Sequence, residues 1–305
     1  MTTIPIDQGD IAAGRALRSQ FAHFWSTEQG DPRAVYDRFV EATPVRANVS
    51  IQRTDGDLAP GIWVRPDSAP PDIAVLFLHG GGYGLGSAPA YAGLVSQLAA
   101  EAGVSAFTLE YPLAPESQLP GALDLAVETL AQLCRDHRTV AIAGDSAGGG
   151  LALATATQAR RGGLDIAAVA VFSPWTDLSL SGASVGEHAI GDPLLDPAYL
   201  RASAAAYLGS AAVDDPRGSP LFDVPGDLPP VLIQVGSDEV LLDDSRRYAD
   251  AVDQAGGVVR LEIWQGMHHV FQFNVAELVS ARRALQNAGQ FLSDHLMGAS
   301  TIASY

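Results

Sequence analysis

The sequence predicts an α/β fold with a central, mostly parallel sheet and helices on both of its faces. Strand-sized apolar runs alternate with helix-sized segments along most of the 305 residues, which is typical of a parallel sheet. The run Ile73–Leu78 is apolar at every position, as expected for a strand buried on both faces. Residues 139–156 give a third indication, because an apolar run leads into a glycine-rich turn and then into a helix-sized run of small residues.

Residues 1–45 precede the sheet and are predicted to form a helical arm. Aromatic side chains gather there among apolar residues at helical spacing, as Phe21, Phe24 and Trp25 show. A second helix is expected over Pro32–Val40, because Asp31 can cap it and proline suits the first helical position. Two interpretations of the arm stay open, a packing element and part of a lid over a site.

Residues 46–305 are predicted to form the main domain. Its strands are expected at residues 45–53, 61–65, 73–78, 104–111, 139–143, 166–172, 231–235 and 258–263. Helices are expected at residues 90–102, 121–136, 199–208 and 276–295. A long, proline-rich insertion at about 175–220 interrupts this rhythm and is expected to cover a site. The strand at 258–263 comes last, so its outer edge is predicted to be unpaired and to support a homodimer.

Composition and charge exclude several classes of protein. The formal net charge is −17, and the 18 basic residues are all arginine. Without lysine the chain supports neither Schiff-base chemistry nor a phosphate-binding P-loop, and its acidity argues against a nucleic-acid partner. No apolar run is long enough for membrane insertion, and the N-terminus lacks a signal-peptide pattern. Cys134 is the only cysteine, which suits a cytoplasmic location.

The glycine-rich turn has the pattern Gly-x-Ser-x-Gly, with Ser146 at its centre. A β-carbon at Gly144 or Gly148 is expected to collide with neighbouring backbone in so sharp a turn. The pattern alone also suits a phosphate-binding turn or simple packing. A serine nucleophile further needs a base, an acid that orients the base, and donors for an oxyanion.

Candidates for these partners occur in the chain order serine, acid, histidine. Backbone donors are expected in residues 79–82 (His-Gly-Gly-Gly), where His79 itself is interpreted as structural. The base is expected to be His268 or His269, and the acid lies within residues 236–244. The adjacent histidines have diverging side chains and no nearby Cys/His cluster, so no metal site is predicted.

Three stretches together resemble the signatures of the hormone-sensitive-lipase-like esterases, the bacterial family IV of the α/β-hydrolase superfamily. They are residues 79–82, 111–116 (Tyr-Pro-Leu-Ala-Pro-Glu) and 144–149 (Gly-Asp-Ser-Ala-Gly-Gly). Within the family the chain looks most similar to members grouped with monoterpene lactone hydrolases. The resemblance implies an α/β-hydrolase fold with a helical cap built from the arm and the insertion. Pro112 is a departure, because the family usually has arginine there, and an internal ion pair is expected to be lost.

The resemblance also implies roles for individual residues. Ser146 would be the nucleophile, and the family pattern Gly-Met-x-His-x-Phe assigns the base to His269. The backbone N–H groups expected to form the oxyanion hole are those of Gly81, Gly82 and Ala147.

The acid is the position where residue type and spacing disagree. The family usually has aspartate at this position, which favours Asp238. When the family's spacing is counted without gaps, forward from Leu228 and back from Tyr248, the acid falls on Glu239. Glu239 is therefore the predicted acid, and only one of the two neighbours is expected to face the histidine. Residues 192–196 mimic the family's acid motif but precede the relevant strand, so Asp192 is interpreted as the start of a turn.

By this resemblance the chain is expected to be a serine carboxylesterase that hydrolyses short- to medium-chain acyl esters through an acyl-enzyme, without a cofactor. A lactone hydrolase and an amidase or acyltransferase on the same triad are the alternatives among enzymes. A small-ligand receptor is the non-enzymatic alternative. Receptors of the family keep the fold but lose the catalytic histidine, whereas His269 is present here.

Overall fold

The computed structural model describes residues 1–54, 58–186 and 191–298. These residues form one nine-stranded sheet in the order β1-β9-β8-β7-β6-β4-β5-β3-β2. The strands are β1 (Thr2–Ile4), β2 (Val49–Arg53), β3 (Gly61–Pro66), β4 (Ile73–Leu78), β5 (Ser105–Leu109), β6 (Thr139–Asp145), β7 (Val169–Phe172), β8 (Val231–Gly236) and β9 (Val259–Trp264). Neighbouring strands are parallel except β2 with β3 and β3 with β5. The mostly parallel sheet predicted from the sequence is confirmed.

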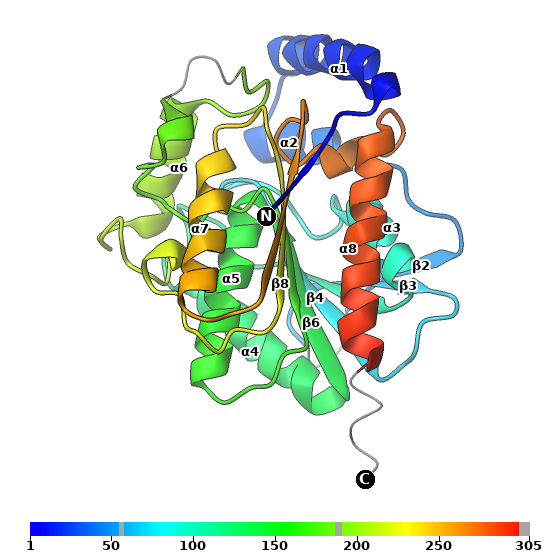
Figure 1. Ribbon diagram of the computed structural model, residues 1–305, viewed down its shortest axis with the longest axis vertical. Coiled ribbons are helices and arrows are strands. Elements are labelled where there is room, and N and C mark those ends of the chain that lie inside the picture. The colour runs from blue at the N-terminus through cyan, green and yellow to red at the C-terminus, as the bar shows by residue number, and fades with distance from the viewer. Residues whose placement is uncertain (55–57, 187–190, 299–305) are drawn as a thin grey trace.

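Helices cover both faces of this sheet (Figure 1). One face carries α3 (Ala92–Ala102) and α8 (Val279–Gly298), and the other carries α4 (Gly121–Asp136), α5 (Ser146–Arg161) and α7 (Leu242–Gln254). The hydrophobic core has two corresponding layers, with Leu98 and Leu285 in one and Leu130 and Leu151 in the other. Every residue of β4 is buried, because helices cover both faces of the sheet. Burial on both faces explains why all its side chains are apolar.

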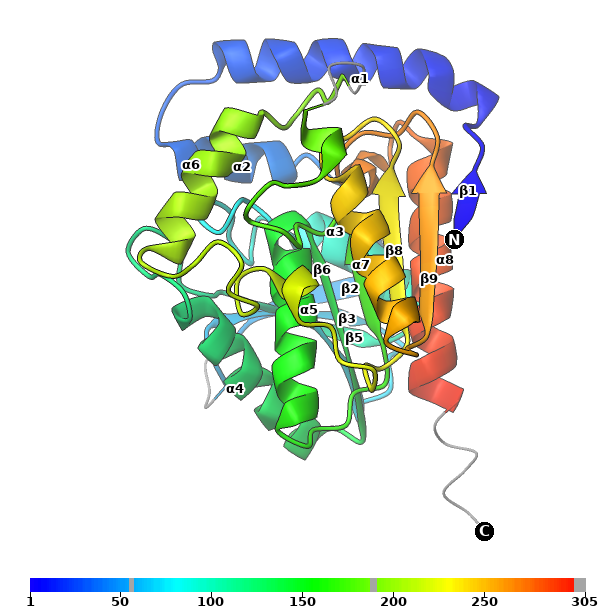
Figure 2. The same ribbon diagram turned by 60° about the vertical axis from the view of Figure 1, so that its left-hand side comes forward.

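Three helices lie beyond the carboxyl ends of the parallel strands (Figure 2): α1 (Gln8–Thr27), α2 (Pro32–Val40) and α6 (Pro197–Leu208). Each begins after an aspartate, Asp7, Asp31 or Asp196, whose carboxylate accepts hydrogen bonds from backbone N–H groups of the first turn. We call α1, α2 and residues 191–208 the roof. Short 3₁₀ turns complete the fold at Ala183–Val185, Pro220–Phe222 and Phe271–Asn274.

The strand β1 corrects the prediction about the edge of the sheet. It pairs in parallel with β9, so that Thr2 lies opposite Glu262 and Ile4 lies opposite Trp264. The predicted unpaired edge of the last strand is therefore wrong, and the predicted homodimer loses the feature on which it depended. A strand of three residues is too short for an alternating pattern to reveal it in the sequence.

Three strands are shorter than expected, and the one expected at 104–111 spans Ser105–Leu109. The strand predicted from residue 45 begins at Val49, because Asn48 has a φ of 60° and cannot continue an extended strand. The strand expected at 166–172 spans Val169–Phe172.

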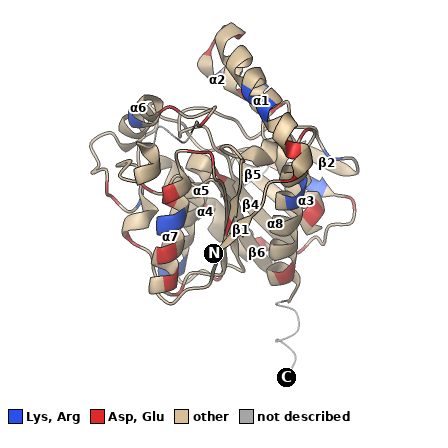
Figure 3. Cartoon of the chain, turned by 45° about the horizontal axis from the view of Figure 1, so that its top comes forward, with Lys and Arg blue, Asp and Glu red and all other residues tan. Residues whose placement is uncertain are grey.

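Charged residues lie mainly on the outer elements, and Figure 3 shows acidic and basic residues interspersed along α1 and α7. Among the described residues, no helix combines the length and the apolar character needed to span a bilayer.

Candidate active site

Ser146 lies in the turn between β6 and α5, and its φ is 53°. Residues with a side chain rarely adopt this left-handed conformation, so the turn holds the serine under strain. A β-carbon on Gly144 would lie 2.5 Å from the carbonyl oxygen of Gly148, and one on Gly148 would lie 2.1 Å from that of Leu78. The steric need for both glycines, predicted from the sequence, is confirmed.

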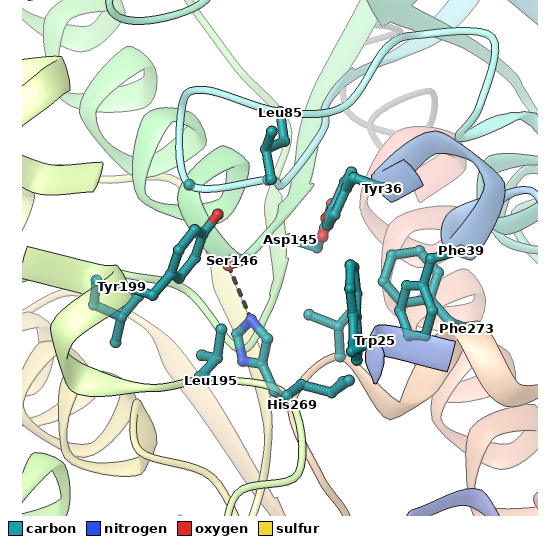
Figure 4. A pocket seen from close by; sticks show the side chains of 15 residues that line it. Trp25, Tyr36, Phe39, Leu85, Asp145, Ser146, Leu195, Tyr199, His269 and Phe273 are labelled. Atoms are coloured by element: carbon teal, nitrogen blue, oxygen red, sulfur yellow. Dashed lines mark hydrogen bonds between the residues drawn. The ribbon is translucent and has the colours of Figure 1, made fainter. Parts of the chain in front are cut away.

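His269 lies in the loop after β9 and faces the serine (Figure 4). Its Nε2 is 2.9 Å from Oγ of Ser146, and its Nδ1 is 3.1 Å from Oε1 of Glu239. The three residues are 8%, 5% and 0% exposed in the order Ser146, His269, Glu239. The fold thus brings the predicted nucleophile, base and acid into one hydrogen-bonded row at the carboxyl ends of three strands.

The carboxylate of Glu239 is held from three sides. Besides facing His269, it accepts hydrogen bonds at 2.9 Å from the N–H of Gly236 and at 2.8 Å from the hydroxyl of Ser173. These donors fix its orientation, so that one oxygen is presented to the imidazole.

Ser173 is a residue of this site that sequence reasoning did not single out. Its φ is 47°, and its Oγ donates to Glu239 while accepting a hydrogen bond at 3.1 Å from the N–H of Val270. Ser173 therefore ties the loop of the acid to the loop of the base. The sequence feature that could have revealed Ser173 is the stretch Ser173–Leu178, which fits the family pattern. No residue type in this stretch indicates a catalytic role by itself.

Asp238 points away from His269. Its carboxylate accepts a hydrogen bond at 2.8 Å from the Ser237 hydroxyl and forms an ion pair at 2.9 Å with Arg18 of α1. The neighbouring carboxylates thus serve different partners, and only Glu239 reaches the imidazole.

The surroundings of His269 raise its pKa. Burial alone would lower the pKa, but the hydrogen bond that Glu239 accepts from the imidazole and the negative charges of Glu239, Asp192 and Asp145 outweigh that effect. A raised pKa makes the imidazole a stronger proton acceptor from the Ser146 hydroxyl.

The other histidines near the site are directed elsewhere. Nε2 of His268 is 3.0 Å from Oδ1 of Asn274, and burial lowers the pKa of His268 to about 4. His79 is fully buried and stacks on Tyr111 with ring centroids 4.2 Å apart, while its Nδ1 lies 2.8 Å from the carbonyl oxygen of Gly80. His79 therefore ties down the glycine loop, as its sequence interpretation supposed.

The predicted oxyanion donors border the serine. Gly81 and Gly82 line the same cavity as Ser146, and Ala147 follows it in the first turn of α5. Gly81 has a φ of 109°, and a β-carbon there would lie 2.3 Å from the carbonyl oxygen of Leu85. Only glycine allows this backbone path beside the serine.

The roof helix α2 holds this glycine loop through Arg33, another residue that sequence reasoning missed. The guanidinium donates at 3.0 Å to the carbonyl oxygens of Gly84 and Ala114 and pairs at 2.5 Å with Glu116. An arginine of the arm thus pairs with the stretch in which Pro112 replaces the family's usual arginine.

Asp145 anchors the loop from below. Its carboxylate accepts hydrogen bonds at 2.9 Å from the N–H of Gly80 and at 3.1 Å from the hydroxyl of Tyr91. Burial raises the pKa of Asp145 to about 7. Asp145 directly precedes Ser146, and these hydrogen bonds give it a structural role.

A cavity of about 200 Å³ lies over Ser146 and His269 (Figure 4). The arm contributes the rings of Trp25, Tyr36 and Phe39 to one side of it. Further residues of its wall, drawn from the insertion and neighbouring loops, are Leu85, Leu194, Leu195, Tyr199, Leu200, Val270 and Phe273. Within residues 1–54, 58–186 and 191–298, no group of three or more His, Cys, Asp or Glu residues could hold a metal ion.

Comparison with known proteins agrees with this geometry. The chain matches the model of the alpha/beta hydrolase fold family over residues 75–273. It is 40% identical over 281 residues to an acetyl-hydrolase of Streptomyces hygroscopicus, a match that covers 88% of this chain and 92% of that protein. It is 33% identical over 267 residues to an ethyl acetate hydrolase of Pseudomonas putida, with 82% and 83% covered.

Its structure is also similar to a crystal structure of an esterase from the bacterial hormone-sensitive lipase family. The TM-score is 0.88 at 31% identity, and the match covers 93% of this chain and 98% of that chain. The glycine loop, the strained serine turn and the row of serine, histidine and carboxylate lie within residues 75–273, which the family model matches. The chain therefore belongs to the α/β-hydrolase fold family and, within it, to the hormone-sensitive-lipase-like esterases.

Proposed function

We propose that this carboxylesterase hydrolyses uncharged acyl esters of short to medium chain length through an acyl-enzyme on Ser146. The observation that carries the proposal is the hydrogen-bonded row of Ser146, His269 and Glu239 beneath an apolar cavity. A serine hydroxyl becomes a competent nucleophile when a base accepts its proton and a carboxylate orients that base.

In the first half of the reaction, Oγ of Ser146 attacks the ester carbonyl while Nε2 of His269 takes the hydroxyl proton. Glu239 stabilises the imidazolium that forms, because its carboxylate accepts the hydrogen bond from Nδ1–H. The imidazolium then gives its proton to the departing alcohol, which leaves an acyl-enzyme. A water molecule deprotonated by His269 attacks this intermediate. The imidazolium then returns the proton to Oγ of Ser146, and the carboxylic acid leaves.

The oxyanion of each tetrahedral intermediate is assigned to the backbone N–H groups of Gly81, Gly82 and Ala147. Gly81 and Gly82 border the same cavity as Ser146, and Ala147 lies at the amino end of α5, where the helix dipole favours negative charge. One such donor typically contributes about 3 kcal/mol to transition-state stabilisation.

The size of the cavity favours small esters. Its volume of about 200 Å³ is below the range of roughly 300–1,000 Å³ common for ligand pockets. The similar proteins named acetyl-hydrolase and ethyl acetate hydrolase point in the same direction. Lactones undergo the same two steps and form a second substrate class, which rests on the resemblance to monoterpene lactone hydrolases.

The arm of residues 1–45 and the insertion at about 175–220 are assigned to a cap over this cavity, with the hydrolase domain spanning residues 46–305. Trp25 from the arm and Leu195 from the insertion both border the cavity, which supports this division. The cap would limit the length of the acyl and alcohol groups that reach Ser146.

Labelling tests the proposed nucleophile. A p-nitrophenyl phosphonate is expected to inactivate the enzyme, and mass spectrometry is expected to locate the adduct on Ser146. The variant Ser146→Ala should keep the far-UV circular dichroism spectrum of the parent and lose hydrolysis of p-nitrophenyl acetate. An adduct on another residue, or full activity of the alanine variant, would refute the assignment.

A further inference from the structure

Asp192 links the roof to the loop after β8 that carries Glu239. It does so by accepting hydrogen bonds through both of its carboxylate oxygens. Its Oδ1 accepts from the N–H groups of Leu194 at 2.9 Å and Leu195 at 3.0 Å. These two bonds form the turn that the sequence predicted. Its Oδ2 reaches across to the N–H of Val240 at 3.0 Å. One side chain of the insertion therefore binds two separate segments.

Val240, the residue that follows Glu239, is held from both sides by side chains that precede β8 in the chain. Its N–H donates to Asp192, and its carbonyl oxygen accepts a hydrogen bond at 2.6 Å from the hydroxyl of Ser184. Ser184 also accepts a bond at 3.0 Å from the N–H of Asp243. The backbone next to Glu239 is therefore positioned by Asp192 and Ser184 as well as by its own strand.

The other end of the Asp192 turn forms part of the cavity wall. Leu194 and Leu195, whose N–H groups Asp192 holds, both border the cavity that contains Ser146 and His269. A displacement of Asp192 would consequently move the wall of the cavity and the backbone beside the acid together.

The charge of Asp192 also acts on His269. The carboxylates of Glu239, Asp192 and Asp145 all favour protonation of the imidazole. The adjacent His268 is neutral near pH 7, because burial lowers its pKa to about 4. Removal of the Asp192 charge therefore weakens the stabilisation of the imidazolium and lowers the pKa of His269.

We propose that Asp192 is a positioning residue of the esterase reaction, which holds the cavity wall at Leu194 and Leu195 and the backbone beside Glu239 in a single arrangement. Closure of the cavity and placement of the acid are thereby coupled through one carboxylate. This inference rests on the function proposed above.

The variant Asp192→Asn tests the proposal. Asparagine has one acceptor oxygen in place of two, so it cannot serve both the Leu194–Leu195 turn and Val240. With p-nitrophenyl acetate we expect kcat to fall about tenfold, the effect of losing one hydrogen bond to a charged group, and KM to rise. The acid limb of the pH profile of kcat/KM should also move to lower pH, because the neutral imidazole persists at lower pH.

Asp196→Asn is the matched control. Asp196 lies in the same segment and accepts hydrogen bonds from the N–H groups of Ala198 and Tyr199 at 2.7 and 3.2 Å. Asparagine caps a helix about as well as aspartate, so this variant should keep kcat within about twofold of the parent. An Asp192→Asn enzyme with the kcat and pH profile of the parent would overturn the proposal, even if its KM or melting temperature changed.

Ser184→Ala separates geometry from charge, and it carries the test if Asp192→Asn does not fold. It releases the carbonyl of Val240 but leaves the Asp192 carboxylate in place. We expect a lower kcat with an unshifted pH profile, and an unchanged kcat would contradict the coupling. Phosphonate labelling of the parent distinguishes a failure of the proposed function from a failure of this inference. A parent that is neither active nor labelled on Ser146 refutes the proposed function, whereas an active, labelled parent with silent variants refutes only this inference.

Discussion

The floor and the roof of the site are built in different ways. The floor consists of the turns after β4, β6, β8 and β9 together with Ser173. It holds Ser146, Ser173 and Val270 at positive φ. Backbone carbonyl oxygens also lie where a side chain would begin on Gly81, Gly144 and Gly148. The roof instead relies on contacts between side chains, such as the rings of Trp25 and Phe39, whose centroids are 5.1 Å apart.

This difference teaches which changes each region tolerates. In the floor the backbone itself sets the position of the reacting groups, so a small change displaces the chemistry. In the roof the side chains shape the space above the serine, and a change of size alters what fits. We therefore expect floor variants to lose turnover or stability, and roof variants that change the size of a side chain in the cavity wall to change substrate preference. Asp192 is the exception in the roof, because its carboxylate reaches the backbone beside Glu239.

The largest effect is expected for Glu239→Gln in the floor. A neutral amide cannot stabilise the imidazolium and favours the wrong tautomer of His269, and the corresponding change in a related triad costs about 10⁴-fold in kcat. Asp238→Asn is the matched neighbour, and its kcat should stay within about tenfold of the parent, because Asp238 pairs with Arg18 instead. Steady-state kinetics with p-nitrophenyl acetate measure both. The reverse ranking would identify Asp238 as the acid.

The next largest effect is expected on stability, when one glycine from each region is replaced by alanine. A β-carbon at Gly148 would lie 2.1 and 2.3 Å from the carbonyl oxygens of Leu78 and His79, so Gly148→Ala should destabilise the protein by about 3 kcal/mol or more. Gly14 in α1 has nothing within 4 Å of that position, and Gly14→Ala should be neutral or stabilising by up to about 1 kcal/mol. Urea unfolding measures both values. Equal effects would remove the contrast between floor and roof.

A smaller, selective effect is expected for Trp25→Ala. Trp25 is 42% exposed and borders the cavity, so its truncation should admit longer chains and raise kcat/KM for p-nitrophenyl hexanoate about threefold to tenfold over that for the acetate. Phe24→Ala is the control, because Phe24 packs on Trp25 at 5.1 Å but does not line this cavity. An unchanged ratio in Trp25→Ala would show that the arm does not limit chain length.

The smallest effect is expected for Arg18→Ala, which removes the ion pair between roof and floor. The side chains of Arg18 and Asp238 are 33% and 40% exposed, so solvent screens their attraction and the loss should stay below about 1 kcal/mol. The difference from the parent should shrink further at high salt in urea unfolding experiments. A loss of several kcal/mol would show that the roof is as rigidly attached as the floor.

Much of the floor could be predicted from the sequence, because its requirements are local. The need for Gly144 and Gly148 follows from the sharpness of one turn. Counting the family's spacing along one strand and one helix, from positions that match the family, distinguished Glu239 from Asp238. The part played by Ser173 could not be predicted, because its partners Glu239 and Val270 lie 66 and 97 residues away and its hydroxyl carries no chemical signature.

The order of serine, acid and histidine came from motifs shared with a known family. By itself, the sequence determined the alternation of strands and helices, the cap of α2 at Asp31 and the need for Gly144 and Gly148. These depend on periodicity and on sterics between near neighbours, which act along the chain. Only the tertiary structure decided that β1 covers β9, that Arg18 meets Asp238 across 220 residues, and that Asp192 binds beside Glu239. Such pairings depend on which surfaces the packed sheet brings together, and no local pattern encodes them.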